Sequence, residues 1–281
     1  MRVPVSRICN KLGVTRQAYY KQSTRQKKKN RQGEIVDQLV QDIRHQLPRV
    51  GGKKLFSMIK GKLHKKGIKM GRDLFFDHLR STGQLIRPRR SYVVTTRSSH
   101  RFRTYDNLLE DKLLLGPHQA WVSDITYLRT QEGFCYLSLI TDAWSRKIVG
   151  YEVSNSLELE GCLKALRMAF KQLPCKHQLI HHSDRGIQYC SNVYTNLLKG
   201  RGVKISMAEK GNCYQNALAE RVNGILKDEF YLSRKFRDLR HAKSQAKQSI
   251  WLYNCLRPHW SLDLKTPDLI HKFIPENQCL T

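Results

Sequence analysis

Residues 121–128 read Trp121-Val-Ser-Asp-Ile-Thr-Tyr-Leu128, and their alternation predicts a β-strand built for burial. Asp124 lies in the middle of this strand. A carboxylate in a buried strand is costly unless it is paired or binds a metal ion. The stretch therefore predicts a core strand and, within it, a candidate functional residue.

The chain after this strand follows a recognisable order of elements. Two more strands are expected at 134–141 and 147–153, joined by short turns. Helical and strand patterns then alternate: helices at 157–173, 191–199, 216–231 and 238–255, and short strands at 178–182 and 203–207. Three consecutive strands followed by this alternation indicate an α/β fold, a mixed sheet flanked by helices.

Charge is unevenly distributed along the 281 residues. The chain has 51 Lys and Arg against 23 Asp and Glu, and residues 1–110 carry 20 of the 28 net positive charges. A basic front half on a nearly balanced back half is typical of a polyanion-binding arm attached to a globular domain. A ribosomal-type binder and an ordinary solvated surface remain alternatives, since charge alone does not separate them.

The front half is expected to be basic and all-α. Residues 5–22 have the outline of a helix-turn-helix, with Gly13 suited to a left-handed turn and Thr15 to capping a second helix. Lys27-Lys28-Lys29 reads as an exposed linker. Three helical stripes follow in 33–86, the first through Ile35, Leu39 and Ile43, the second through Leu55, Ile59 and Leu63, and the third through Leu74, Phe75, His78 and Leu79.

The third stripe could belong to a helix that reads a DNA groove, although any small three-helix bundle looks similar. Four regions are expected: 1–32, a short helix-turn-helix-like segment and basic linker; 33–86, a helical DNA-binding-like region; 87–114, a basic linker; and 115–275, an α/β core with a C-terminal helix.

Neither cysteine spacing nor hydropathy suggests a secreted or membrane protein. The eight cysteines never form a C-x-x-C pair, and several lie in apolar runs, so we expect reduced core residues. No stretch approaches the roughly 20 apolar residues needed to span a bilayer. A soluble, cytoplasmic protein is expected.

Two further acidic residues stand out beside Asp124. Asp184 follows the buried strand at 178–182, where open α/β sheets usually place their sites. Glu220 lies on the polar face of the helix at 216–231, together with Asn216, Asn223 and Lys227.

Each carboxylate also has an ordinary structural reading. Asp124 could pair with an arginine, Asp184 could stabilise a turn and Glu220 could be a solvated helix residue. Asp142 also ends a strand, but its surroundings indicate a capped turn. Together, Asp124, Asp184 and Glu220 are hard oxygen donors suited to Mg²⁺. Two such ions can stabilise the attacking and leaving oxygens of a phosphoryl displacement.

The spacing and neighbours of these residues match a known pattern. Asp184 and Glu220 have 35 residues between them. The flanking motifs are Trp121-Val-Ser-Asp-Ile-Thr-Tyr127, His182-Ser-Asp-Arg-Gly-Ile-Gln-Tyr189, Lys210-Gly-Asn-Cys-Tyr-Gln-Asn-Ala-Leu-Ala-Glu220 and Tyr253-Asn-Cys-Leu-Arg-Pro-His259. Over about 115–275 the chain resembles the second-frame (OrfB-type) catalytic subunit of bacterial insertion-sequence transposases, whose core is of the D,D-35-E retroviral-integrase type.

The resemblance implies a ribonuclease-H-like fold with Asp124, Asp184 and Glu220 as catalytic residues and ligands of Mg²⁺ or Mn²⁺, two ions in all. It implies that water nicks the element end and that the freed 3′-hydroxyl attacks a second phosphodiester, without a covalent protein–DNA link. Gln215 stands where many relatives have Asp; because that position is not a ligand, little effect is expected.

The resemblance also implies partners. These are double-stranded DNA, as element ends and target, further copies of the chain assembled on that DNA, and an upstream-frame subunit or fusion that supplies end-binding. We therefore expect weak end-specific binding by this chain alone. Candidates for phosphate positioning are His182, Arg185, Lys210, Asn212, Asn216, Asn223 and Lys227. His182 could instead be a packed core histidine, and the lysines a solvated face.

Three other functions compete with transposition. A retroviral-type integrase usually carries a zinc module with paired His and paired Cys, and no C-x-x-C exists here. The second alternative is a DNA-binding regulator with an inert core, and the presence of all three carboxylates argues against it. A nuclease of ribonuclease H type would cleave without joining strands.

Overall fold

The computed structural model describes residues 4–86, 102–110, 112–175, 177–209 and 216–272. The chain forms two compact units, residues 1–87 and 88–281, which are taken in turn. In the described residues no helix is both long and apolar enough to cross a membrane.

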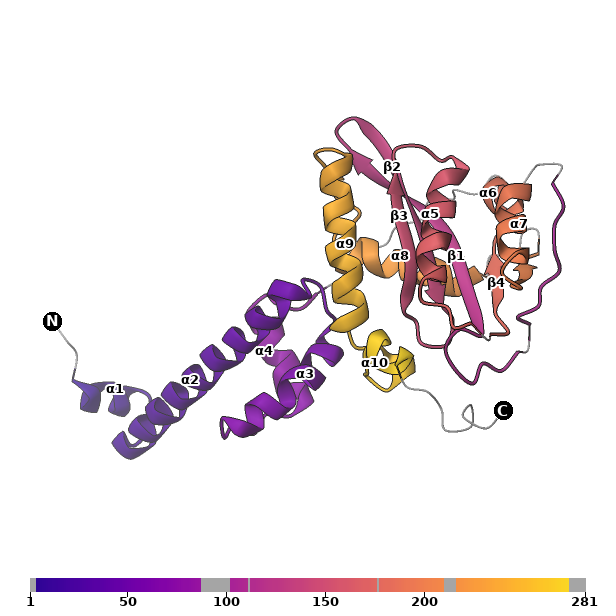
Figure 1. The fold of residues 1–281 in the computed structure, drawn as a ribbon. Coiled ribbons are helices and arrows are strands. Elements are labelled where there is room, and N and C mark those ends of the chain that lie inside the picture. Colours follow the sequence, from indigo (N-terminus) through magenta and orange to yellow (C-terminus); the bar gives the residue numbers. More distant parts are fainter. Residues whose placement is uncertain (1–3, 87–101, 111, 176, 210–215, 273–281) are drawn as a thin grey trace. The chain divides into compact units, whose positions relative to one another are not determined.

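The first unit is all-α, as expected. Its helices are α1 (Val5–Lys11), α2 (Arg16–Gln46), α3 (Gly52–Lys65) and α4 (Arg72–Ser81) (Figure 1). Gly13 adopts a positive φ of 65° between α1 and α2, and the Thr15 side chain caps α2 by accepting a hydrogen bond from the Ala18 amide. Both local predictions are confirmed.

Long-range packing in this unit joins the second half of α2 to α3 and α4. The buried apolar side chains are Val36, Leu39, Val40, Ile43, Leu55, Ile59, Leu63, Phe75 and Leu79. Asp37 of α2 accepts hydrogen bonds from the His78 ring of α4 at 2.8 Å and from the Gln84 side chain at 2.6 Å. The stripe through α3 is confirmed, whereas Leu74 is 64% exposed and faces away from the core.

The expected linker at Lys27-Lys28-Lys29 is wrong. These residues lie inside α2, which runs without a break for 31 residues. Lysine has a high helix propensity, so a run of exposed lysines does not end a helix in the absence of Gly or Pro. The expected boundary between residues 32 and 33 therefore falls within one helix.

The second unit is built on a mixed sheet, which confirms the α/β expectation. Its strands are β1 (Ala120–Thr130), β2 (Gly133–Asp142), β3 (Ile148–Ser154), β4 (Ile180–Ser183), β5 (Lys204–Met207) and β6 (Lys235–Phe236). The order is β3-β2-β1-β4-β5, with β6 added beside β1. β1 is antiparallel to β2 and parallel to β4. β1 is therefore the central strand, and it carries Asp124.

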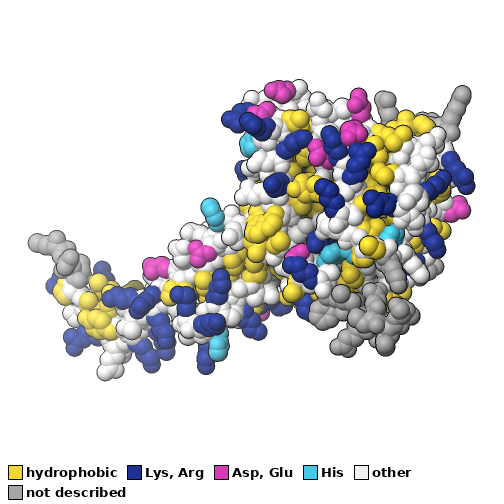
Figure 2. Space-filling model, in the orientation of Figure 1, with side chains coloured by type: hydrophobic (Ala, Val, Ile, Leu, Met, Phe, Trp, Pro, Cys, Tyr) yellow, Lys and Arg dark blue, Asp and Glu magenta, His cyan; other side chains and the backbone are white. Residues whose placement is uncertain are grey.

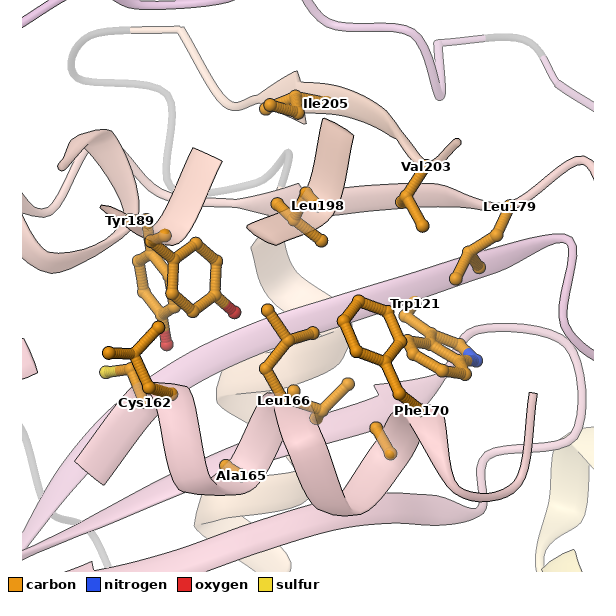
Figure 3. Packing of buried hydrophobic residues seen from close by; sticks show 14 of the residues in the cluster. Trp121, Cys162, Ala165, Leu166, Phe170, Leu179, Tyr189, Leu198, Val203 and Ile205 are labelled. Atoms are coloured by element: carbon orange, nitrogen blue, oxygen red, sulfur yellow. The ribbon is translucent and has the colours of Figure 1, made fainter. Parts of the chain in front are cut away.

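Helices cover both faces of this sheet (Figure 1). They are α5 (Leu159–Phe170), α6 (Ile187–Cys190), α7 (Asn192–Lys199), α8 (Ala217–Glu229), α9 (Leu239–Cys255) and α10 (Pro267–His271), and a 3₁₀ turn covers Trp260–Leu262. Successive side chains of a strand point to opposite faces. Trp121 packs with Leu166 and Phe170 of α5, as Figure 3 shows, while Val122 packs with Ala219 of α8.

The close approach of α5 to the sheet depends on a glycine. A Cβ on Gly150 of β3 would lie 2.2 Å from the backbone oxygen of Ala165. Tyr189, Leu198 and Cys162 complete this side of the core (Figure 3).

Of the expected linker at 87–114, residues 102–110 and 112–114 are described, and some of them contact the second unit. In the described part, the Met207 amide donates to the Asp106 oxygen at 3.3 Å, and the Leu108 amide donates to the Ser206 hydroxyl at 2.8 Å. This segment thus pairs with β5, and Leu109 and Leu114 pack against the face that holds Val122.

Candidate active site

The two aspartates meet because their strands are neighbours in register. Ser123 of β1 pairs with Ser183 of β4 in the parallel ladder. Asp124 and Asp184 are the next residues of these two chains, so their backbones lie side by side at the point where β4 ends. This juxtaposition follows from strand pairing between residues far apart in the sequence.

Glu220 joins them from α8. By alternation, Asp124 points to the same face of the sheet as Val122, which packs against Ala219 in the first turn of α8. Glu220 is the next residue of that turn, and its side chain is exposed. The charges of both Asp184 and Glu220 act on Asp124.

Hydrogen bonds fix the two aspartates. Asp124 Oδ1 accepts from the Ile125 amide at 2.8 Å, and Oδ2 accepts from Asn223 Nδ2 at 2.8 Å. Asp184 Oδ1 accepts from the Gly186 amide at 3.0 Å. Each carboxylate therefore has a defined orientation while part of its surface still faces solvent.

The electrostatics of Asp124 are unusual for an aspartate. Burial, followed by the negative charge of Asp184, raises the pKa of Asp124 from 3.8 to about 7, although the hydrogen bond from Asn223 opposes the shift. Ionised Asp124 is thus an unfavourably placed anion, which a nearby cation would stabilise.

These residues fit a divalent metal ion in chemistry, although the described side chains form no ready-made cage. Two half-buried aspartates and a nearby glutamate are the hard oxygen ligands that Mg²⁺ prefers. In the described residues, no group of three or more His, Cys, Asp or Glu side chains is close enough to hold a metal ion. Mg²⁺ is commonly bound through one or two carboxylates with waters and substrate phosphates, so the aspartate pair agrees with that mode.

The residues expected to position DNA divide into two groups. Asn216 and Asn223 are buried; Asn216 Nδ2 donates to the Ser123 carbonyl at 3.2 Å, and Asn223 holds Asp124. Both amides therefore connect α8 to β1, and their contact with phosphates stays a prediction. Their Oδ1 atoms have no partner among the described residues.

His182 is also a core residue, which was the alternative reading. Its ring is fully buried, and Nδ1 lies 2.8 Å from the Ser206 hydroxyl in β5. This burial favours a packed core histidine over a phosphate contact. Lys210 and Asn212 lie outside the described residues.

Arg185 and Lys227 remain near the site with accessible charge. Arg185 is half-buried, and its Nε donates to the Ala208 carbonyl at 2.9 Å. Lys227 Nζ lies 4.5 Å from the centre of the Tyr127 ring, and burial lowers its pKa while the charge of Asp124 opposes this. Both positive groups border the face that holds the carboxylates.

Sequence reasoning missed what anchors the far end of α8. Arg257, only 3% exposed, donates to Glu229 through Nε at 2.8 Å and Nη2 at 2.5 Å, and its Nη1 lies 2.9 Å from the His259 ring. Tyr253 and Asn254 of the same motif bond to the backbone of Arg146 and Ile148. The motif was visible in the sequence, but its role is architectural.

Asp142 is a structural residue, as the turn reading predicted. Its Oδ1 accepts from the amide and hydroxyl of Ser145, and Oδ2 accepts from the His118 amide. It lies at the end of β2, where Trp121 and not Asp124 is its partner across the ladder.

Comparison with known proteins agrees with this geometry. Two models described as integrase core domain match residues 115–213 and 201–267. An insertion element IS600 uncharacterized 31 kDa protein of Shigella sonnei is 33% identical over 264 residues, which are 92% of this chain and 96% of that protein. The chain belongs to the insertion-element transposases with an integrase core.

Two further similarities place this transposase. The transposase InsF for insertion sequence IS3A of Escherichia coli (strain K12) is 39% identical over 152 residues, 54% of this chain and 53% of that protein. The match therefore spans about half the length of that relative. A chain of the simian T-cell lymphotropic virus intasome in complex with PP2A regulatory subunit B56 gamma superposes with a TM-score of 0.51 at 16% identity, covering 80% of this chain and 76% of that chain.

That likeness, together with the matched models, makes the second unit of the transposase a retroviral-integrase-like, ribonuclease-H-like core, as the sequence implied. The transposase is a DDE-type enzyme of DNA transposition. The regulator and ribonuclease H readings are not supported by these matches.

Proposed function

We propose that this transposase cleaves and joins DNA strands with Asp124, Asp184 and Glu220 as its catalytic residues. The observation that supports the proposal best is the placement of Asp124 and Asp184 at adjacent positions of paired parallel strands, facing a helix whose first turn carries Glu220.

The three carboxylates would hold Mg²⁺ or Mn²⁺, two ions in all, with Glu220 completing the ligand set once DNA is bound. When bound, the ions supply Lewis-acid stabilisation of the attacking and leaving oxygens in an in-line displacement. The raised pKa of Asp124 supports this assignment, because burial and then the charge of Asp184 disfavour its anion, which a cation would stabilise.

Other residues of the chain have supporting roles in this proposal. Asn223 keeps Asp124 in one orientation by hydrogen bonding to Oδ2, so that Oδ1 and Oδ2 keep fixed directions. Lys227, stacked on Tyr127, and Arg185 would contact phosphates of the bound strand. Lys210 and Asn212 remain proposed phosphate contacts.

The substrates proposed are double-stranded DNA ends of the element and a double-stranded target, handled by several copies of the chain assembled on DNA. An upstream-frame subunit or fusion would add end recognition. Because the substrate is bacterial DNA, we place the reaction in the cytoplasm.

A strand-transfer assay tests the proposal. Wild-type protein, a labelled duplex carrying the element end and a plasmid target are incubated with Mg²⁺, and nicked and joined products are separated on a gel. Asp184→Asn should abolish both products, whereas Glu160→Gln, which removes an exposed carboxylate of α5, should retain them. An Asp184→Asn protein that still joins strands would overturn the assignment, and cleavage without joined products would favour the nuclease.

A further inference from the structure

The first half of α2 forms a long basic helical surface outside the active site. Between Arg16 and Arg31 the helix has seven Lys and Arg and no acidic residue; they are Arg16, Lys21, Arg25, Lys27, Lys28, Lys29 and Arg31. All seven side chains are exposed. Figure 2 shows Lys and Arg gathered along the helices of the first unit. We call this surface the basic half of α2.

The packing of the unit leaves this half largely uncovered. The buried positions of α2 begin at Gly33, where a Cβ would lie 3.1 Å from the His78 ring of α4. Before Gly33, α2 contacts the short helix α1, and Tyr19 and Ser23 on that side are half-buried. The basic half is therefore a helix with one narrow packed side.

The cations occupy the remaining circumference. At 3.6 residues per turn they spread over about 60% of the helix circumference, and their 16 residues extend roughly 24 Å. A flat polyanion would meet only one side of such a helix. A groove with phosphates along both walls would meet all of it, and the major groove of B-DNA, about 12 Å wide, accepts an α-helix.

An exposed aromatic lies within the basic arc. Tyr20 is 56% exposed and lies between Lys27 and Arg31 around the helix. Its ring contacts Tyr19 edge-on with centroids 5.5 Å apart, which holds it against the helix. In a groove, such a ring would meet base edges while the cations reach the phosphates on either side.

We propose that the basic half of α2 inserts into the major groove of duplex DNA, through residues that take no part in the catalytic site. The inference rests on the proposed function only in that the ligand is DNA. The second helix of the expected helix-turn-helix at 5–22 is the start of α2, which continues without a break to Gln46, in the manner of a helix that crosses the groove and not of a short recognition helix.

Fluorescence anisotropy on a labelled 30-base-pair duplex of arbitrary sequence tests the proposal. The variant Lys27→Gln/Lys28→Gln/Lys29→Gln keeps helix propensity. Its matched control, Lys164→Gln/Lys171→Gln/Lys204→Gln, removes three exposed charges from the second unit. Since each phosphate contact contributes about 0.9 to the slope of log K against log salt, the slope should fall by about 3 in the α2 variant and by less than 1 in the control.

The groove is tested separately. Dimethyl sulfate modifies guanine N7 in the major groove, so bound wild-type protein should protect N7 and the α2 variant should not. Equal slopes for the two triple variants would overturn the proposal. It would also be overturned if netropsin, a ligand of the minor groove, displaced the protein from DNA and the bound protein gave no N7 protection. Loss of self-association in sedimentation, with DNA affinity kept, would assign the surface to a second copy and also overturn it.

The two proposals fail independently. At low salt and saturating DNA, the α2 variant should still join strands, because its carboxylates are intact. Conversely, Asp124→Asn should keep the full salt slope while losing joined products. Wild-type protein that protects N7 but never joins strands would reject the catalytic proposal alone.

Discussion

Replacing Asp124 by Asn should stabilise the metal-free protein while removing its response to Mg²⁺. The folded-state pKa of Asp124 is about 7 against 3.8 for an unperturbed aspartate. A shift of about 3 units corresponds to about 4 kcal/mol of differential free energy. Solvent at the half-buried carboxylate screens part of this, so we expect the free energy of unfolding to rise by about 1–4 kcal/mol at pH 7.5.

The sign follows from linkage. Because the folded-state pKa is raised, ionisation of Asp124 opposes folding; the penalty is absent below pH 3.8 and complete above pH 7. The gain from Asp124→Asn should therefore shrink toward zero as the pH approaches 4. Asn is tolerated sterically, since the Asn223 amide, whose Oδ1 has no partner among the described residues, can flip to accept from the new Nδ2.

Urea unfolding followed by circular dichroism, with EDTA at pH 7.5 and pH 4.5, measures this. Glu160→Gln, which changes an exposed carboxylate, should stay within about 0.5 kcal/mol of wild type. Adding Mg²⁺ should raise the midpoint for wild type but not for Asp124→Asn. A variant that is no more stable than wild type in EDTA, or a gain that persists at pH 4.5, would refute the electrostatic account of Asp124.

Three further predictions concern the scaffold. Arg257→Met removes the ion pair with the half-buried Glu229 and should cost about 3–5 kcal/mol of unfolding free energy. The double variant Arg257→Met/Glu229→Leu should recover much of that loss, and urea unfolding of the single and double variants measures both effects. Burial lowers the pKa of His181 to about 3, so the folded protein, which keeps this ring neutral, loses about 2 kcal/mol of unfolding free energy as the pH falls from above 6.5 to 5. In His181→Gln the difference in unfolding free energy between pH 7 and pH 5 should be smaller by that amount. Gly150→Ala should prevent α5 from docking and sharply lower the melting temperature, because a backbone oxygen lies 2.2 Å from the added carbon; an unchanged melting temperature would contradict this packing.

Sequence patterns predicted secondary structure best where it depends on residues that are close together in the chain. Alternation and 3.6-residue periodicity placed the strands and helices of the second unit to within a few residues, and Thr15 and Gly13 specified a cap and a turn. The same reasoning failed at Lys27–Lys29, because exposed lysines suit a linker and a helix equally. It also failed at Leu74, where two adjacent apolar residues competed for one buried position.

Roles of polar residues required the tertiary structure. Asn216, Asn223 and His182 have the composition of a nucleic-acid surface, yet all three are buried and bond to neighbouring strands or their side chains. The sequence does not show whether the partner of a polar side chain is a solute or a residue of a distant strand.

The sequence by itself determined the kinds of element, the basic front half and the acidic residues suited to a metal, because propensity, periodicity and charge are properties of neighbouring residues. Only the tertiary structure decided that Asp124 and Asp184 are adjacent, that Asn223 orients Asp124 and that Arg257 anchors the helix of Glu220. Those contacts join residues 28 to 99 positions apart, and their geometry arises from strand register and helix docking.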